Sequence, residues 1–221
     1  MIKINKGSSP SELDQYKREC SESISRGTTK LLDDFSRKDD LRISLAEEQG
    51  YLCAYCMQRI NPENGDTKIE HFHPQTEYPT EQLDYSNLLL CCNGNQGDRP
   101  ANQHCDTKKK NAEIKYNPAL SPSIEQTIRY ERDGKIVSDD EDWNNHIDNV
   151  LNLNYSRLRE NRESVLRAVD QALAKNSGMR SKSQIDTIIQ NWKAKNSSGE
   201  LKEYCGAAIY RLQKHPAYKR G

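Results

Sequence analysis

The sequence has no long apolar stretch and few aromatic side chains. Hydrophobic residues make up 33% of the 221 residues, with two Trp and two Phe, whereas 30% of the residues are charged. No segment approaches the ~18 apolar residues that a membrane-spanning helix needs, and residues 1–5 do not have the form of a secretion signal. We therefore expect a cytoplasmic protein without membrane contact, with a thin core that relies on a metal or a partner subunit for stability.

An excess of charge of either sign is also absent. Lys and Arg together number 33, as do Asp and Glu, so the formal net charge is +0 at pH 7. Overall charge therefore does not point to a nucleic-acid partner, and a basic surface has to come from local clusters. Lys108, Lys109 and Lys110 form such a cluster, with Arg99 in the preceding loop, and are candidates for contacts with backbone phosphates. A solvated helix face is the alternative for the three lysines.

Changes in sequence pattern divide the chain into three parts. Residues 1–49 are charged and have a helical pattern, in which Ser36-Arg37-Lys38-Asp39 resembles a capping box and Gly50 ends a helix. Residues 50–117 contain most of the cysteines and histidines among turn-forming residues, and residues 118–221 form a small hairpin and a helical region. The expected fold is α+β and mainly helical, with a small core flanked by helices.

Short strands are predicted in the middle part. Residues 59–60 and 68–72 are candidates, and the segment between them contains Asn64-Gly65, a pair that favours a hairpin. A loop rich in Gly, Asn and Pro, residues 93–103, then precedes a helix that begins near His104. The predicted order is hairpin, loop, helix.

The C-terminal part is predicted to consist of a hairpin and three helices. Residues 127–130 and 135–137 flank the turn-forming pair Asp133-Gly134, and further turns are expected at Gly178 and at residues 197–199. Apolar residues recur at steps of three and four, which is typical of helix faces that pack in a core. The three faces comprise Leu158, Val165, Leu166, Val169 and Leu173; Ile185, Ile188, Ile189 and Trp192; and Leu201, Tyr204, Cys205, Ala208, Ile209 and Leu212.

The cysteines indicate a metal site. Their number, seven, is odd, and a reducing compartment disfavours a disulfide framework. Cys53 and Cys56 have the spacing that turns two thiolates toward one point, as a tetrahedral zinc ion requires at about 2.3 Å per ligand. Redox motifs share this spacing, so a second pair has to come from Cys91, Cys92 and Cys105 downstream. Unrelated buried thiols are the alternative.

A second group of candidate catalytic and metal-binding residues lies in the segment Ile69-Glu70-His71-Phe72-His73-Pro74. Adjacent Glu and His side chains on a strand point to opposite faces. Both reach one site only where the strand ends or bends, which Pro74 favours. A surface glutamate and a hydrogen-bonded core histidine are the alternative, but the cysteines upstream and Asn87 downstream favour a functional site.

Together these motifs resemble the HNH endonuclease motif, over about residues 50–112. The order is Cys53-x2-Cys56, Glu70-His71-x-x-Pro74, Asn87 followed by Cys92, and Cys105-Asp106-x-Lys108. The segments IEHFHP, DYSNLLLCC and HCDTKKK are more narrowly similar to the HNH nuclease subunit of Septu anti-phage systems, which also accompanies retrons, beside an ABC-type ATPase. The resemblance implies a small zinc-stabilised ββα-metal core.

The resemblance also implies a role for each matching residue. His71 matches the general base that activates water, and Glu70 matches an acidic residue that helps to bind the catalytic divalent metal, Mg²⁺ or Mn²⁺. Asn87 matches the middle asparagine, which fixes the loop against the base. The structural zinc ligands of the family match Cys53, Cys56, Cys92 and Cys105.

The sequence departs from the family at His104-Cys105-Asp106, where the usual order is Cys-His. The last ligand of the catalytic metal is therefore either Asp106 or His104, and a hard cation favours the carboxylate. Cys91 beside Cys92 leaves a smaller ambiguity, in which the step from Asn87 favours Cys92.

The function implied by the resemblance is hydrolysis of phosphodiester bonds in nucleic acid, with DNA as the expected substrate, inside an anti-phage complex. The expected partners are the nucleic acid, an ABC or SMC-like ATPase and, in the retron setting, a reverse transcriptase with its DNA. RNA, for example tRNA, is the alternative substrate, since a 2′-hydroxyl can serve as nucleophile. The other alternative is a non-catalytic zinc-stabilised binding module, but zinc binding does not require Glu70, His71 or Asn87.

Overall fold

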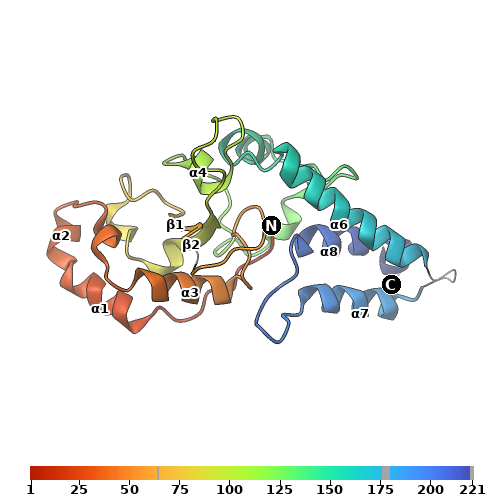
Figure 1. The fold of residues 1–221 in the computed structure, drawn as a ribbon, viewed down its shortest axis with the longest axis horizontal. Helices are drawn as coiled ribbons and strands as arrows, with labels where there is room; N and C mark the ends of the chain where they lie inside the picture. The colour runs from red at the N-terminus through yellow and green to blue at the C-terminus, as the bar shows by residue number, and fades with distance from the viewer. Residues whose placement is uncertain (64, 176–179, 220–221) are drawn as a thin grey trace.

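The computed structural model describes residues 1–63, 65–175 and 180–219, in an α+β fold that is mainly helical (Figure 1). The helices are α1 (Ser11–Glu19), α2 (Ser21–Ser25), α3 (Lys38–Glu48), α4 (Cys105–Lys109), α5 (Glu141–Asn145), α6 (Ser156–Ala174), α7 (Lys182–Lys193), α8 (Cys205–Gln213) and α9 (Pro216–Lys219). Shorter helical turns are η1 (Leu31–Asp34), η2 (Pro79–Glu81), η3 (Tyr85–Asn87), η4 (Ile124–Gln126) and η5 (His146–Val150). The strands are β1 (Thr67–His71), β2 (Leu88–Cys92), β3 (Arg129–Tyr130) and β4 (Ile136–Val137). Among the helices described, none has both the length and the hydropathy of a membrane span.

The two longer strands form an antiparallel pair at the centre of the N-terminal half of the chain. Their register places Thr67 opposite Cys92 and His71 opposite Leu88. All of β2 is buried, because α3 and α4 both contact this strand, and Figure 1 shows the pair between these two helices. A strand that is covered on both faces is expected to have a continuous apolar sequence, and the sequence of β2, LLLCC, is of this kind.

The prediction of a hairpin around residues 61–66 is wrong. The strand β1 pairs with β2, whereas Arg59 makes only an isolated bridge to Leu52. A five-residue ladder that buries β2 stabilises more than a two-residue strand beside a favourable turn, so tertiary packing outweighs the local turn signal. Asn64, on which that turn was centred, lies outside the described residues.

The boundaries of α3 agree with the sequence at one end only. The helix begins at Lys38, with Arg37 in the capping position and without a side-chain cap, so the capping box at Ser36 is wrong. Arg37 instead pairs with Asp40 one turn into the helix. The predicted end is confirmed, because Gly50 follows the helix with a φ of 60°, a conformation in which an added Cβ would collide with Leu201.

The C-terminal part agrees with its prediction except at the start of the third helix, because Tyr204 has a left-handed backbone and α8 begins at Cys205, so that Leu201 and Tyr204 precede it. The strands β3 and β4 pair around the Asp133-Gly134 turn. The helix α8 contacts both α6 and α7 through apolar faces, and Figure 1 shows the three on the opposite side of the molecule from α1 and α2. Gly178, where a turn was predicted between α6 and α7, lies outside the described residues. Backbone hydrogen bonds from Leu201 to Gly50 and from Tyr204 to Met57 join this part to the segment that carries Cys53 and Cys56.

Candidate metal centre and active site

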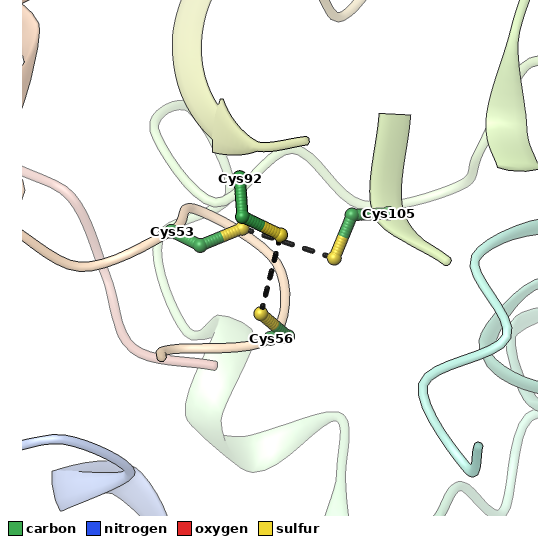
Figure 2. A group of neighbouring side chains, drawn as sticks. All are labelled: Cys53, Cys56, Cys92 and Cys105. Atoms are coloured by element: carbon green, nitrogen blue, oxygen red, sulfur yellow. Dashed lines mark hydrogen bonds between the residues drawn. The ribbon is translucent and has the colours of Figure 1, made fainter. Parts of the chain in front are cut away.

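Four cysteines converge at the point where three segments meet (Figure 2). Cys53 and Cys56 lie in the turns after α3, Cys92 is the last residue of β2, and Cys105 is the first residue of α4. The Sγ atoms of Cys53 and Cys105 are 3.8 Å apart, as are those of Cys56 and Cys92. All four sulfur atoms lie within 4.8 Å of one another.

This arrangement fits a tetrahedral metal ion. With metal–sulfur bonds of about 2.3 Å, the edges of the tetrahedron are about 3.8 Å long, and the two measured distances have this value. The four side chains are buried and are not joined as disulfides. Burial raises the pKa of the Cys56 and Cys105 thiols well above the usual value, whereas the hydrogen bond with Cys105 lowers that of Cys92, so a cation is needed for all four to be thiolates together. The four cysteines can therefore hold a metal such as zinc.

The neighbouring residues in the sequence occupy different places. Cys91 is fully buried but does not belong to the group of four. The alternation of side chains along a strand accounts for this, since Cys91 and Cys92 must point to opposite faces of β2. Between the two cysteines that the sequence left open, the structure brings Cys92 into the cluster.

His104 lies against the cysteine cluster. Its Nδ1 atom is 3.2 Å from the Sγ of Cys105 and 4.0 Å from that of Cys92, and its ring stacks on Tyr155. The main-chain N–H of His104 donates to the carbonyl of Gly94, where the backbone approaches so closely that an added Cβ would collide with His104. The imidazole is thereby fixed on the side of the thiols.

Glu70 and Asp106 meet on the other side of α4. Glu70 is only 3% exposed, and its Oε1 atom accepts a hydrogen bond from the Tyr55 hydroxyl at 2.9 Å and faces the Lys109 ammonium at 2.8 Å. Burial raises the pKa of Glu70, and the adjacent Asp106 carboxyl raises it further, whereas Lys109 lowers it. Asp106 is also within 3.7 Å of the Lys68 ammonium. Two carboxyl groups this close repel each other as anions, and a cation between them removes the repulsion.

His71 is oriented by a main-chain carbonyl group. Its Nε2 atom lies 2.9 Å from the carbonyl oxygen of Gln82. A carbonyl oxygen only accepts, so Nε2 carries the hydrogen. Burial lowers the pKa of His71, which favours the neutral ring and leaves the lone pair on Nδ1.

Asn87 connects the end of β1 to the segment that returns to β2. Its Oδ1 atom accepts from the main-chain N–H of His73 at 2.8 Å, and its Nδ2 atom donates to the carbonyls of His73 at 3.1 Å and Glu81 at 3.2 Å. These bonds use the whole amide group. The side chain therefore ties the backbone just after His71 to the backbone at Glu81, next to Gln82, and makes no hydrogen bond to the imidazole.

The basic residues divide between two environments. Lys110 and Arg99 are exposed, and Lys108 donates to the carbonyl of Pro100 at 3.1 Å. Lys109, in contrast, is buried, with its ammonium on Glu70 and 3.3 Å from the His71 carbonyl oxygen. This differs from the expectation of a phosphate contact, because a buried cation bonded to a carboxylate is not presented to a ligand on the surface.

The roles of three residues around the site were not predicted from the sequence. For Tyr55 and Gln82 the sequence gives no indication of a role, since a tyrosine between two cysteines and a glutamine in a loop are common. The role of Lys109 leaves a trace, because it follows Asp106 by three residues and so lies on the same face of α4. Read with Glu70, this spacing would have indicated an internal ion pair.

Lys109→Met is expected to destabilise the protein by about 3–5 kcal/mol, because it leaves a buried carboxylate without its cation. Urea unfolding of the zinc-loaded protein measures this change. The control is Lys110→Met at the neighbouring exposed position, which is expected to change stability by less than about 0.5 kcal/mol. Equal stability of the two variants would show that the Lys109–Glu70 pair contributes nothing to the fold.

Two known proteins are similar to this chain in sequence. No protein-family model matches the sequence. Septu protein PtuB from Bacillus thuringiensis is 24% identical in an alignment that covers 57% of this chain and 43% of the relative. The Retron Ec83 putative HNH endonuclease from Escherichia coli is 31% identical in an alignment that covers 57% of this chain and 64% of the relative. The chain thus matches less than two thirds of the length of either relative. The resemblance is thus supported by similarity to a Septu protein and to a putative HNH endonuclease of a retron.

Proposed function

We propose that the chain is an HNH-type endonuclease that hydrolyses phosphodiester bonds of nucleic acid, with DNA as its substrate, within an anti-phage defence complex. The observation that carries this proposal is the arrangement at the end of β1. There Glu70, which lies next to the Asp106 carboxyl, directly precedes His71, whose ring bonds to the Gln82 carbonyl and whose pKa is lowered by burial. Carboxylates suit a hard divalent cation, and a positioned imidazole suits proton abstraction at neutral pH.

His71 acts as the general base in this proposal. Because its Nε2–H donates to the Gln82 carbonyl, the lone pair on Nδ1 is free to take a proton from the attacking water. The lowered pKa of the buried ring keeps it unprotonated at neutral pH. General base catalysis of this kind contributes a factor on the order of 10²–10⁴ in rate.

Glu70 and Asp106 would hold the catalytic metal, Mg²⁺ or Mn²⁺, as the core of a ββα-metal site. When bound, the ion neutralises charge on the scissile phosphate and on the leaving 3′ oxygen. Tyr55 and Lys109 both contact Oε1 of Glu70, which fixes the carboxyl group and leaves its other oxygen available as a ligand. The role proposed for Asn87 is to hold the backbone around His71.

The four cysteines hold a structural zinc ion in this proposal. All four are buried and leave no open position, as is typical of structural sites. The ion joins the turn after α3, the end of β2 and the start of α4, so it sets the position of Asp106, which directly follows Cys105. His104 contributes a contact to the sulfur atoms and not a catalytic ligand.

A partner supplies recognition or control in the proposed complex. The exposed basic side chains near the site, Lys110 and Arg99, offer little surface for phosphates, and the net charge of the chain is +0. We propose an ABC or SMC-like ATPase as this partner, together with a retron reverse transcriptase and its DNA in the retron setting. The names of the two relatives, a Septu protein and a retron endonuclease, support this setting.

Labelled DNA and RNA, incubated with the purified chain and with its complex in the presence and absence of Mg²⁺, test the proposal. We expect Mg²⁺-dependent cleavage of DNA. Cleavage of RNA and not of DNA would change the proposed substrate to RNA and leave the assignment as a nuclease in place. Intact DNA and RNA under every condition, with zinc-loaded protein, would contradict the proposal and favour a zinc-stabilised binding module.

Asp106→Ala is expected to raise the Mg²⁺ concentration required for half-maximal cleavage by a factor on the order of tenfold or more. The reason is that Asp106 shares the buried site of Glu70, whereas His104 contacts the cysteines. His104→Ala is the matched comparison, and its Mg²⁺ requirement should stay close to that of the unchanged protein. The opposite order, with His104→Ala inactive and Asp106→Ala normal, would assign the metal ligand to His104.

A further inference from the structure

A glutamine with no assigned role lies completely buried between the N-terminal helices and the candidate active site. Gln82 is 0% exposed and belongs to the connector between β1 and β2, residues 72–87. Its Nε2 atom donates to the carbonyls of Thr28 and Pro79, both at 2.7 Å, and its Oε1 atom accepts from the main-chain N–H of Leu31 at 2.9 Å. The side-chain amide is therefore fully hydrogen-bonded to backbone groups.

The main chain of the same residue orients the imidazole of His71. The carbonyl oxygen of Gln82 accepts the Nε2–H of His71 at 2.9 Å. A carbonyl group can select one tautomer only if it stays in place, and the three side-chain hydrogen bonds hold it there. Removal of the amide would leave these buried backbone groups without partners, which is costly.

Two of these three bonds reach the N-terminal segment, at Thr28, which lies between α2 and η1, and at Leu31, the first residue of η1. An ion pair between Lys17 of α1 and Asp84 adds a second contact between this segment and the connector. Both ions of that pair are partly exposed, so it contributes little. The buried amide of Gln82 is thus the main polar link from the N-terminal helices to the imidazole.

We propose that Gln82 is a positioning residue for His71, and that its side chain fixes the connector on the N-terminal segment so that its carbonyl holds the imidazole in the Nε2–H tautomer. This inference rests on the proposed function in one respect, namely that His71 is the general base. Without the amide, the connector is free to shift, and both the tautomer and the direction of Nδ1 are no longer determined.

The chain contains a matched control for this role. Gln49 is 4% exposed, and its amide also makes three hydrogen bonds to backbone groups: to the carbonyls of Leu52 and Leu90 and from the N–H of Leu90. These bonds join the end of α3 to β2 and do not involve the connector or His71. Loss of this amide should therefore cost similar stability without altering the imidazole.

The test compares Gln82→Leu with Gln49→Leu in the full zinc-loaded chain. Nitrogen-15 NMR of the histidine rings at mildly alkaline pH reports the tautomer directly and requires no substrate. We expect His71 to be in the Nε2–H form in the unchanged protein and in Gln49→Leu, and to become a mixture of tautomers in Gln82→Leu. For cleavage by Gln82→Leu, kcat should fall by a factor on the order of 10² with KM nearly unchanged.

Identical His71 ring signals in Gln82→Leu and the unchanged protein would overturn the inference, as would an equal change in Gln49→Leu. If Gln82→Leu does not fold, Gln82→Met, which preserves the length of the side chain, is measured under the same criteria. Failure of the proposed function has a different signature. In that case His71→Ala cleaves normally, whatever the ring signals of the Gln82 variant.

Discussion

His71→Ala is expected to reduce the rate of nucleic-acid cleavage by a factor on the order of 10²–10⁴, because it removes the group that takes the proton from water. The protein should remain folded. The hydrogen bond of the ring is to the Gln82 carbonyl, and an unpaired carbonyl costs about 1–3 kcal/mol, less than the usual 5–15 kcal/mol of folding free energy. Single-turnover rates at saturating Mg²⁺ measure the effect, and zinc content together with circular dichroism monitors the fold.

His73→Ala is the control for this variant, because it removes an imidazole two residues away. The ring of His73 faces Glu81, with Nδ1 2.6 Å from its carboxylate, and contacts Tyr78. The hydrogen bonds between His73 and Asn87 use only the main chain of His73, so they survive the substitution. Cleavage by His73→Ala should stay close to normal. Equal losses in the two variants, or normal cleavage by His71→Ala, would contradict the assignment of the base.

Cys92→Ala is expected to abolish zinc binding and, with it, stable folding. Structural zinc sites in small domains contribute about 10–16 kcal/mol of apparent binding free energy, which exceeds the margin of stability of most domains. In this chain the cluster joins the turn after α3, the end of β2 and the start of α4, so its loss separates all three. Metal analysis should find one zinc per chain in the unchanged protein, and Cys53→Ser should behave like Cys92→Ala.

Cys91→Ala provides the matched control for the zinc prediction. Cys91 is the adjacent residue, has the same side chain and is equally buried, but its sulfur lies outside the group of four. This variant should retain one equivalent of zinc and remain folded, with a small loss of stability from the cavity. Cys92→Ala protein that is folded and zinc-loaded, or Cys91→Ala protein without zinc, would overturn the assignment.

The helices and the cysteine cluster could be predicted because their signals are local and periodic. The apolar faces of α6, α7 and α8 repeat at helical spacing, and the two residues between Cys53 and Cys56 suffice to bring their thiols together. Gly50 marked the end of α3 because its positive φ is accessible to glycine at little cost.

The strand pairing could not be predicted because it depends on contacts distant in the sequence. The turn-forming residues between 60 and 67 favoured a local hairpin, but β1 pairs with a strand about twenty residues further on. What decides the pairing is the burial of Leu88, Leu89 and Leu90 between α3 and α4, and a local turn signal contains no information about that.

The residues of the candidate site were named from the sequence, whereas the contacts that they make could not be. Adjacent positions on β1 suggested a shared role for Glu70 and His71, and the structure brings Asp106 to Glu70 and a carbonyl to His71. Gln82 escaped notice because its side chain and its carbonyl act through backbone groups and the fold of the connector, which leave no mark on a sequence. Lys109 was interpreted as a surface cation because lysines are rarely buried, yet its ammonium forms an internal pair with Glu70.

The most direct test of the catalytic centre is a titration of cleavage with Mg²⁺ by the zinc-loaded complex, after divalent ions have been removed under conditions that spare zinc. The cysteines and the carboxyl pair are separate sites, so zinc alone should not support cleavage of labelled DNA. We expect no product before Mg²⁺ is added, and a saturable rise in rate as it is added. Cleavage at full rate by zinc-loaded protein without any added Mg²⁺ or Mn²⁺ would contradict the assignment of Glu70, His71 and Asp106 as the catalytic centre.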